Sequence, residues 1–398
     1  MVCRNHTYHI NDTHRFILRY GGGKPHYSSV LWINDYWHYT AKLTSFHNLS
    51  WQSVWVVMLL FFFSQHINLA KNNIKVLVAV VLVGLLGGYY TNTAKANKIQ
   101  DLYAIHELIH YIDTEQWDAI LRSKDLNMND YLHLNVLNLA LSHKGLLQTD
   151  LFKYPQSGLQ SLMSTYQSHI EESWLFSQIY YHVGVTALAY DLAFGTTVGF
   201  TYGCPAMTKL LVKCNLIYGT YPAAERFISI LERTWEYKDW AQEQRRFLYN
   251  DDAVENDPEL GTRRKSLTDK EDLFANLLAL PENLTLILEA NPDNKVAFDY
   301  MIASLLLWKD MPSIKAFVEH YEGTEVLPTL PPLLQQAVIS YAEHDPAYCL
   351  EHGVSEQLLA AFQDFKRKVV SLRRARQDLK VGLANYRQTF WYYLLFSK

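Results

Sequence analysis

The sequence predicts an all-α chain: a transmembrane helical hairpin followed by an α-solenoid of degenerate helical pairs. Two long runs without Lys, Arg, Asp or Glu lie near the N-terminus, between Lys42 and Lys71 and between Lys75 and Lys95. The rest of the chain repeatedly places apolar residues on a 3.6-residue period, interrupted at short intervals by Gly, Pro, Asn and Asp. A helical pair cannot bury both of its apolar faces alone, so neighbouring pairs must stack.

The clearest helical pair lies at 209–248. Its first helix presents one apolar face, formed by Leu210, Leu211, Cys214 and Ile217. Gly219 then breaks the helix, and Pro222 restarts it in a first-turn position. The spacing Gly-x-Tyr-x-x-Ala, at Gly219, Tyr221 and Ala224, is that of the second half of a tetratricopeptide-like unit. A third helix is expected to continue the apolar pattern with Trp235, Trp240 and Phe247.

We divide the chain into an irregular N-terminal segment at 1–48, a transmembrane hairpin at 49–94 and a tetratricopeptide-like helical-repeat domain at 95–398. The net charge of −4 gives no indication of nucleic-acid binding. The four cysteines are too few and too scattered for a disulfide scaffold. The histidines of the N-terminal segment lack a regular ligand spacing, so we predict neither a metal nor a cofactor there.

The hairpin prediction rests on two apolar centres, at 51–63 and 76–90. Each uncharged run can cover the ~20 residues that a spanning helix needs; the alternative for each is a buried core helix. Trp55 and Tyr89 lie toward outer ends of the runs, where amphipathic rings favour the headgroup zone. The connecting loop carries Lys71 and Lys75, which slightly favours a cytoplasmic loop and an extracytoplasmic helical domain.

Apolar periodicity predicts further helices after the hairpin, at 99–112, 131–141, 159–166, 174–194, 273–280, 296–308, 311–321, 330–341 and 354–380. The stretch at 250–272 has hardly any large apolar side chains, so we expect an exposed loop. Arg263, Arg264 and Lys265 lie within it and should be solvated.

Three stretches resemble blocks of an uncharacterised family of bacterial membrane proteins: LIYGTYPAAERFISILERTWEYKDWA, ANPDNKVAFDYMIASLLLWKDM and QTFWYYLLF. An earlier block of that family is similar to NVLNLALSHKGLLQTDLFKYPQSG. In this family hydrophobic helices precede a tetratricopeptide-like domain of unknown function, and the likeness covers residues 99–396. The resemblance implies a bacterial inner membrane location and transfers no catalytic residue. The family carries several spanning helices, whereas this chain shows two and its residues 1–48 match no block. We therefore expect either a shortened form of the family or a start that lies inside a longer gene.

One motif favours an enzyme: His106-Glu107-Leu108-Ile109-His110 is a literal HExxH. On a helix, His106 and His110 would share a face for zinc, and Glu107 could activate a bound water. No third ligand follows at a familiar spacing, and a repeat stacked through Ile105 and Ile109 would leave both histidines nearer the surface.

Two classes of function therefore remain open. We favour a membrane-anchored scaffold that binds a protein or peptide partner without catalysis, with no catalytic, cofactor or metal residues. The alternative is a membrane-tethered zinc metallopeptidase that uses His106, Glu107 and His110. The basic stretch at 366–380 could meet anionic lipid headgroups or an acidic partner, although a solvated helix face is the commoner outcome. The apolar cluster at 390–396 should dock as the last helix or dip into the membrane interface.

Overall fold

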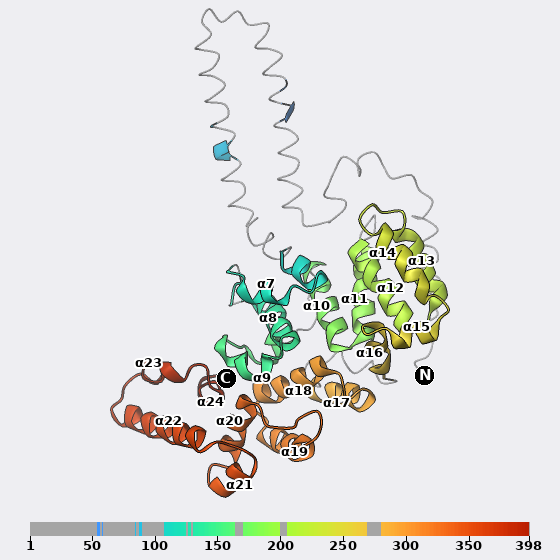
Figure 1. Cartoon of the computed structure of the whole chain (residues 1–398). Coiled ribbons are helices and arrows are strands. Elements are labelled where there is room, and N and C mark those ends of the chain that lie inside the picture. The colour runs from blue at the N-terminus through green and yellow to red at the C-terminus, as the bar shows by residue number, and fades with distance from the viewer. Residues whose placement is uncertain are drawn as a thin grey trace, which may run out of the picture. The chain divides into compact units, whose positions relative to one another are not determined.

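The protein was analysed as a computed structural model that describes residues 107–124, 126–128, 130–163, 170–199, 205–268 and 280–397, with isolated positions at 54, 55, 58, 84 and 87–89 (Figure 1). The regular elements in these ranges are α-helices and short 3-10 helices. A single isolated bridge joins Glu322 and Leu327. The predicted all-α class is therefore confirmed for the described residues.

The chain divides into two compact units, one made of 1–110 with 196–204 and the other of 111–195 with 205–398. Most of the described residues belong to the second unit. Its longer α-helices are α8 (Tyr131–His143), α10 (Ile170–Val183), α11 (Thr186–Gly199, whose end enters the first unit), α12 (Pro205–Ile217), α13 (Tyr221–Leu231), α17 (Leu280–Ala290), α18 (Lys295–Trp308), α19 (Met311–Tyr321), α20 (Pro332–Tyr341) and α22 (Glu356–Arg374).

Shorter elements connect these helices. They are α7 (Trp117–Arg122), α9 (Leu147–Asp150), η1 (Leu151–Lys153), η2 (Gly158–Ser161), α14 (Lys238–Gln244), η3 (Arg245–Phe247), α15 (Asp251–Asn256), α16 (Leu260–Lys265), α21 (Pro346–Glu351), α23 (Leu379–Gly382), η6 (Ala384–Tyr386) and α24 (Phe390–Phe396). Successive helices such as α12 and α13, or α17 and α18, pack directly on each other (Figure 1).

Several helical pairs in this unit turn through the same backbone motif. Gly145, Gly184 and Gly219 follow the first helix of a pair with φ of +66°, +104° and +70°. The N–H of the residue after each glycine donates to a carbonyl five residues earlier, at 2.8–2.9 Å. Glu115 takes the same role with φ of +54° and the same hydrogen bond, from Gln116 N. The residue with positive φ reverses the chain, and the hydrogen bond after it satisfies a carbonyl of the last helical turn that would otherwise lack a donor.

The pair α12–α13 shows how the sequence forms such a unit. Ala224 is fully buried, and Tyr221 begins the second helix with only 7% of its surface exposed. After α13 the prediction is wrong in one respect: Trp235 is 100% exposed and lies in a turn before α14. The apolar period there is too short to fix a helix start, so the chain turns and leaves the indole outside.

The single helix predicted at 174–194 is also wrong, because the chain forms α10 and α11 with a break at Gly184. Apolar residues continue on both sides of this glycine, so periodicity alone does not reveal the break. A Cβ at Gly184 would lie 2.8 Å from Nδ2 of Asn294, which donates to Val183 O at 2.9 Å. The break therefore lets the amide of the N-cap residue of α18 bind the end of α10.

The core centres on α8 and α18, which pack on each other and are both contacted by α9. Both helices are buried on nearly every side. Two polar side chains of α8 form hydrogen bonds within this core. Asn138 Nδ2 donates to Ser161 O at 2.8 Å. Ser142 Oγ donates to the buried carboxylate of Asp299 on α18 at 2.9 Å.

The exposed loop predicted at 250–272 is wrong over its described part, because α15 and α16 occupy it. Val254 and Leu260 are buried there, and Asn250 caps α15 by accepting from Ala253 N at 3.1 Å. A Cβ on Gly261 would lie 2.2 Å from Glu255 O, so only glycine allows the two helices to approach. Two buried apolar residues, a helix cap and a close glycine contact are therefore enough to hold α15 and α16 in a stretch that has hardly any large apolar side chains.

The C-terminal helix α24 packs on α20. Trp391 Nε1 donates to Gln336 O at 2.9 Å, and Phe390 N donates to Gln336 Oε1 at 2.7 Å. Tyr393 OH donates to Leu307 O of α18 at 3.1 Å. The aromatic cluster is therefore docked on helices of the second unit. The helix predicted at 354–380 ends earlier, at Arg374, because Arg376 adopts φ of +52°.

The predicted N-terminal segment at 1–48 lies outside the described residues, as does almost all of the predicted transmembrane hairpin at 49–94. The positions described within the hairpin range, among them Val54, Trp55 and Tyr89, are helical. Of the helices in the described part, none combines the length and the apolar character of a membrane span. Membrane anchoring therefore stays a prediction.

Candidate functional site

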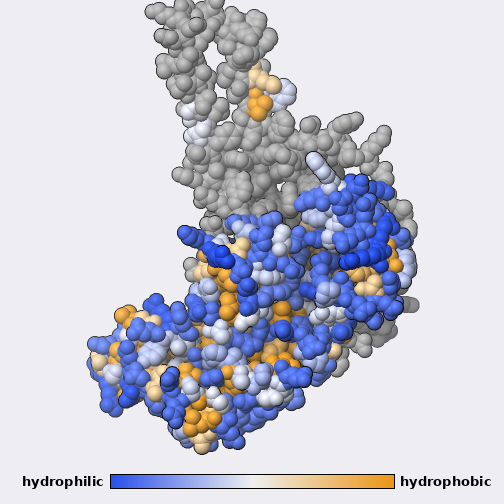
Figure 2. Space-filling model, in the orientation of Figure 1, coloured by the Kyte–Doolittle hydropathy of each residue, from blue (hydrophilic) through white to orange (hydrophobic). Residues whose placement is uncertain are grey.

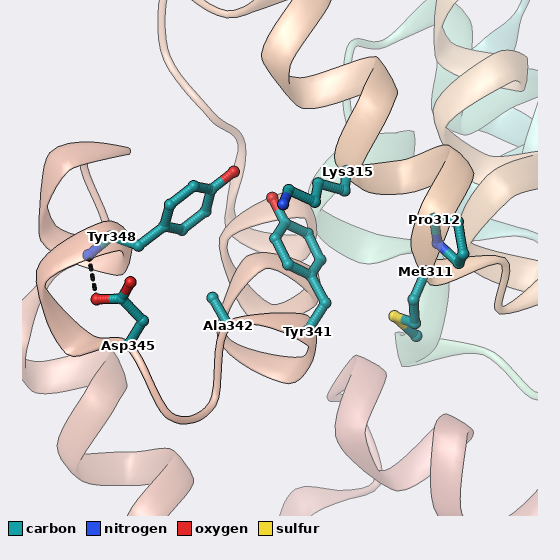
Figure 3. Close-up of a pocket in the computed structure, with 7 residues that line it drawn as sticks. All are labelled: Met311, Pro312, Lys315, Tyr341, Ala342, Asp345 and Tyr348. Atoms are coloured by element: carbon teal, nitrogen blue, oxygen red, sulfur yellow. Dashed lines mark hydrogen bonds between the residues drawn. The ribbon is translucent and has the colours of Figure 1, made fainter.

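A pocket of about 500 Å³ opens between α19, α20 and α21 (Figure 3). Local sequence signals position its walls. Asp310 caps α19 by accepting from Ser313 N at 3.2 Å, and Asp345 caps α21 by accepting from Tyr348 N at 3.0 Å. Pro312 and Pro346 occupy first-turn positions, where the missing N–H costs nothing. These caps fix where α19 and α21 begin and hence where their side chains lie.

The pocket wall is mainly apolar with a few polar atoms. Its lining residues are Met311, Pro312, Lys315, Tyr341, Ala342, Asp345 and Tyr348. In Figure 3, Met311 and Lys315 reach the pocket from α19, and Tyr341 reaches it from α20. The phenyl rings of Tyr341 and Tyr348 meet edge to face, with centroids 6.0 Å apart. Aromatic rings and methionine form an adaptable apolar surface at binding sites.

The Tyr341 hydroxyl is buried, and among the described residues it has no partner of full hydrogen-bond geometry, although the Tyr348 hydroxyl lies close enough to interact with it. Burial and the neighbouring Tyr348 phenol raise its pKa, so the group remains a neutral donor and acceptor. A buried polar group without a partner is costly, typically by about 1–3 kcal/mol. A ligand that offers a hydrogen bond to this hydroxyl would recover that cost.

Charge at the pocket is balanced. Lys315 Nζ lies 3.7 Å from Glu319 Oε1 and 5.7 Å from the ring centroid of Tyr348. The Tyr348 hydroxyl donates to the same Glu319 oxygen at 3.3 Å, and burial raises the pKa of Tyr348. The Asp345 carboxylate is already engaged as the cap of α21. The Lys315 ammonium, which Glu319 shares, and the Tyr341 phenol could therefore orient a ligand with an apolar body and an acceptor group.

A second polar cluster, with His182 buried and His143 and Arg263 half-buried, joins helices distant in sequence. Trp117 stacks on His143 with ring centroids 4.0 Å apart, and His143 Nε2 lies 3.1 Å from His182 Nδ1. Arg263 NH2 approaches the same His182 nitrogen at 3.4 Å, and its Nε donates to Tyr181 O at 3.0 Å. Burial lowers the pKa of His143 to about 4 and holds that of His182 well below its usual range. With Arg263 adjacent, these neutral imidazoles brace helix ends and do not offer a cation site.

The predicted zinc residues are only partly described, since His106 lies outside the described residues. Glu107 and His110 are exposed, whereas Leu108 and Ile109 between them are 2% and 6% exposed. Within the described ranges, no group of three or more His, Cys, Asp or Glu side chains is placed to hold a metal ion. The helix thus turns its aliphatic side chains inward at this point.

The predicted turn residues lie together at the junction of α12 and α13. Tyr221 OH donates to Asp251 Oδ1 at 2.5 Å. Arg264 reaches the same carboxylate at 2.8 Å and donates to Leu216 O and Ile217 O at 2.8 and 3.0 Å. The prediction that Arg263 and Arg264 are solvated is therefore wrong, because each binds carbonyls at the C-terminal end of a helix, α10 and α12 respectively.

The pocket itself was not predicted from the sequence. The signals that could have found it are the caps Asp310 and Asp345, each followed closely by proline. Tyr341 and Tyr348 flank the second cap. Such signals place helix starts, but they do not say that α19 and α21 face each other.

The chain belongs to a family of unknown function, DUF6057, whose model matches residues 16–397. The match begins well before residue 99, where the predicted resemblance started, so most of the segment at 1–48 is part of the family pattern. No curated protein and no solved structure matches the chain.

Proposed function

We propose that this chain is a membrane-anchored helical-repeat scaffold whose tetratricopeptide-like domain binds a protein or peptide partner without catalysis. The observation that carries the proposal is the pocket between α19, α20 and α21, with its apolar wall and the buried Tyr341 hydroxyl. Its volume is in the range of pockets that hold ligands in proteins, roughly 300–1,000 Å³. One or two side chains of a peptide would fill it.

The pocket's chemistry favours a particular peptide. An aliphatic or aromatic side chain would contact Met311 and the two tyrosine rings, and a carbonyl or carboxylate would accept from Tyr341 and Lys315. Glu319 shares Lys315, so a fully ionic ligand gains little there and the apolar contact dominates.

Two further observations support the architecture in this proposal. The helical pairs turn at left-handed residues such as Gly145, Gly184 and Gly219, which is consistent with a degenerate repeat. The uncharged runs near the N-terminus have the length of spanning helices, which supports an anchor. Release of the full chain from membranes by carbonate washing would contradict the anchor but leave the pocket proposal standing.

The test is affinity purification of the full chain from detergent-solubilised membranes, with mass spectrometry of what accompanies it. We expect one partner to be recovered with the wild type. The amount recovered should fall about tenfold or more with Lys315→Glu combined with Tyr348→Ala, because removing an interface anchor costs more than about 1.4 kcal/mol of binding free energy. Lys265→Ala, an exposed change on α16, is the matched control. Equal recovery of every accompanying protein with the pocket variant would refute the proposal.

A further inference from the structure

The segment from 366 to 387 has a charge unlike the rest of the chain. It carries eight basic residues and a single acid, Asp378, in a chain whose net charge is −4. The basic residues are Lys366, Arg367, Lys368, Arg373, Arg374, Arg376, Lys380 and Arg387. The structure divides this run into two halves with different surroundings.

In the first half the cations have partners on the protein. Lys366 pairs with Glu343, and Arg367 pairs with Asp364 at 3.3 Å. Lys368 Nζ lies 5.9 Å from the ring centroid of Tyr386. These residues are accounted for by packing within the domain.

The arginines of the second half have no such partners among the described residues. Arg373, Arg374 and Arg376 are exposed, and no ion pair of the described structure includes them. The nearby carboxylate of Asp378 is engaged as the cap of α23, where it accepts from Lys380 N at 2.7 Å. Three guanidinium groups therefore face solvent at one helix end with their like charges uncompensated, and the exposed Lys380 ammonium beside them lies 6.0 Å from the ring centroid of Phe396.

Apolar side chains are held among these cations. Val381 on α23 is 72% exposed, and Val370 on α22 is 47% exposed, one helical turn before Arg373 and Arg374. Close packing fixes α23 at this place, because a Cβ on Gly382 would lie 2.4 Å from Leu372 Cδ1 of α22. In Figure 2, hydrophilic surface over α22 and α23 is interrupted by hydrophobic residues. Neither valine is used in the core.

We propose that this α22 basic surface, made of Arg373, Arg374, Arg376 and Lys380 with Val370 and Val381, docks on an anionic phospholipid membrane. The cations would meet lipid phosphates, and the two valines would enter the headgroup boundary. A cluster of about four to eight basic residues on an amphipathic helix is typical of anionic lipid binding. Exposed apolar side chains beside such cations bind at the interface. The inference does not depend on the peptide pocket.

Other polyanions fit these residues less well. Single-stranded nucleic acid would favour exposed aromatic rings on which bases stack, whereas the large hydrophobic side chains exposed on α22 and α23 are valines. An acidic protein would pair with the arginines but would gain little from the exposed Val381. At a lipid surface, by contrast, Lys380 would lie at the level of the phosphates while the neighbouring Val381 entered the apolar boundary below them.

The test uses the full chain in neutral detergent micelles, titrated with phosphatidylglycerol or with phosphatidylcholine, and counts retained lipid by native mass spectrometry. We expect the wild type to prefer phosphatidylglycerol. Arg373→Gln with Arg374→Gln should weaken that binding roughly 25-fold, about fivefold for each cation removed. Lipid held elsewhere on the chain is common to all variants, so the difference reports on this surface.

The matched control is Lys238→Gln with Lys265→Gln, which removes the same charge at exposed positions on α14 and α16 and should leave the preference intact. Raising NaCl from about 0.05 M to about 0.5 M should weaken the binding of phosphatidylglycerol to the wild type and leave the binding of phosphatidylcholine unchanged. An equal preference in the wild type and the Arg373/Arg374 variant overturns the proposal. The proposal is also overturned if the wild type does not prefer phosphatidylglycerol to phosphatidylcholine but binds poly(A) or polyglutamate, and the Arg373/Arg374 variant loses that binding.

Discussion

Replacing Asp299 with asparagine should stabilise the chain at neutral pH. This carboxyl lies on α18, is 8% exposed, and accepts hydrogen bonds from Ser142 on α8 and from Gln148 on α9. Burial raises its pKa from 3.8 to about 6, an effect that the two hydrogen bonds only partly oppose. At neutral pH the folded protein thus holds an ionised carboxylate in a site that favours the neutral form.

The magnitude follows from the shift. A rise of about two pKa units corresponds to about 3 kcal/mol, since each unit is 1.36 kcal/mol. The folded pKa is raised, so this cost is absent below pH 3.8, grows as pH rises to about 6 and is complete at pH 7. Asparagine stays neutral and can accept from Gln148 while its amide donates to Ser142 Oγ. Asp299→Asn should therefore gain up to about 3 kcal/mol at pH 7.5 and little at pH 4.

The buried histidines act in the opposite direction over the same pH range. Burial, and secondarily Arg263, lowers the pKa of His143 from 6.5 to about 4, and the same two causes hold the pKa of His182 well below its usual range. Their contribution is present above pH 6.5 and is lost as pH falls toward 4, because the unfolded chain then takes up protons that the folded chain refuses. In the wild type the two effects partly cancel. The Asp299→Asn variant should show a steeper rise of stability between pH 4 and 6.5.

The assay is urea unfolding of the purified chain, followed by tryptophan fluorescence at pH 4.5, 6 and 7.5. The difference in unfolding free energy between Asp299→Asn and the wild type should increase with pH. Ser142→Ala is the contrasting variant, because it removes a donor to the carboxylate and should destabilise more at pH 7.5 than at pH 4.5. A pH-independent difference, or a less stable asparagine variant at pH 7.5, would refute the reasoning.

Three further outcomes are expected. Arg264→Ala should lower stability by about 1–3 kcal/mol, because it removes the side-chain donor to Ile217 O and one of the two donors to Leu216 O, whereas the exposed Lys265→Ala should stay within about 0.5 kcal/mol. Gly219→Val should lower the free energy of unfolding by about 1 kcal/mol or more, because φ at this position is +70°. The cost is conformational rather than steric, since the added Cβ meets nothing closer than 3.8 Å, and an unchanged melting temperature would contradict it. Purified chain should hold no stoichiometric zinc by elemental analysis; one zinc per chain, lost in His106→Ala, would favour the peptidase instead.

Local chemistry in the sequence determined most helices and their ends. A helix needs only hydrogen bonds four residues apart, an apolar face and terminal caps, all of which lie within one stretch of chain. The helix at 311–321 was predicted with the observed bounds, and its cap Asp310 and first-turn Pro312 are readable directly. The positive φ of Gly219 follows in the same way from a glycine between two periodic segments.

Tertiary structure alone decided the role of polar side chains and of short helices. Arg263 and Arg264 look solvated in a polar stretch, and only the approach of α10 and α12 supplies the carbonyls that they bind. The same holds for the pocket, which Tyr341 and Lys315 both line because α19 and α20 pack together. Partners for a charge or a hydroxyl come from residues distant in sequence, and no local pattern encodes which helices meet.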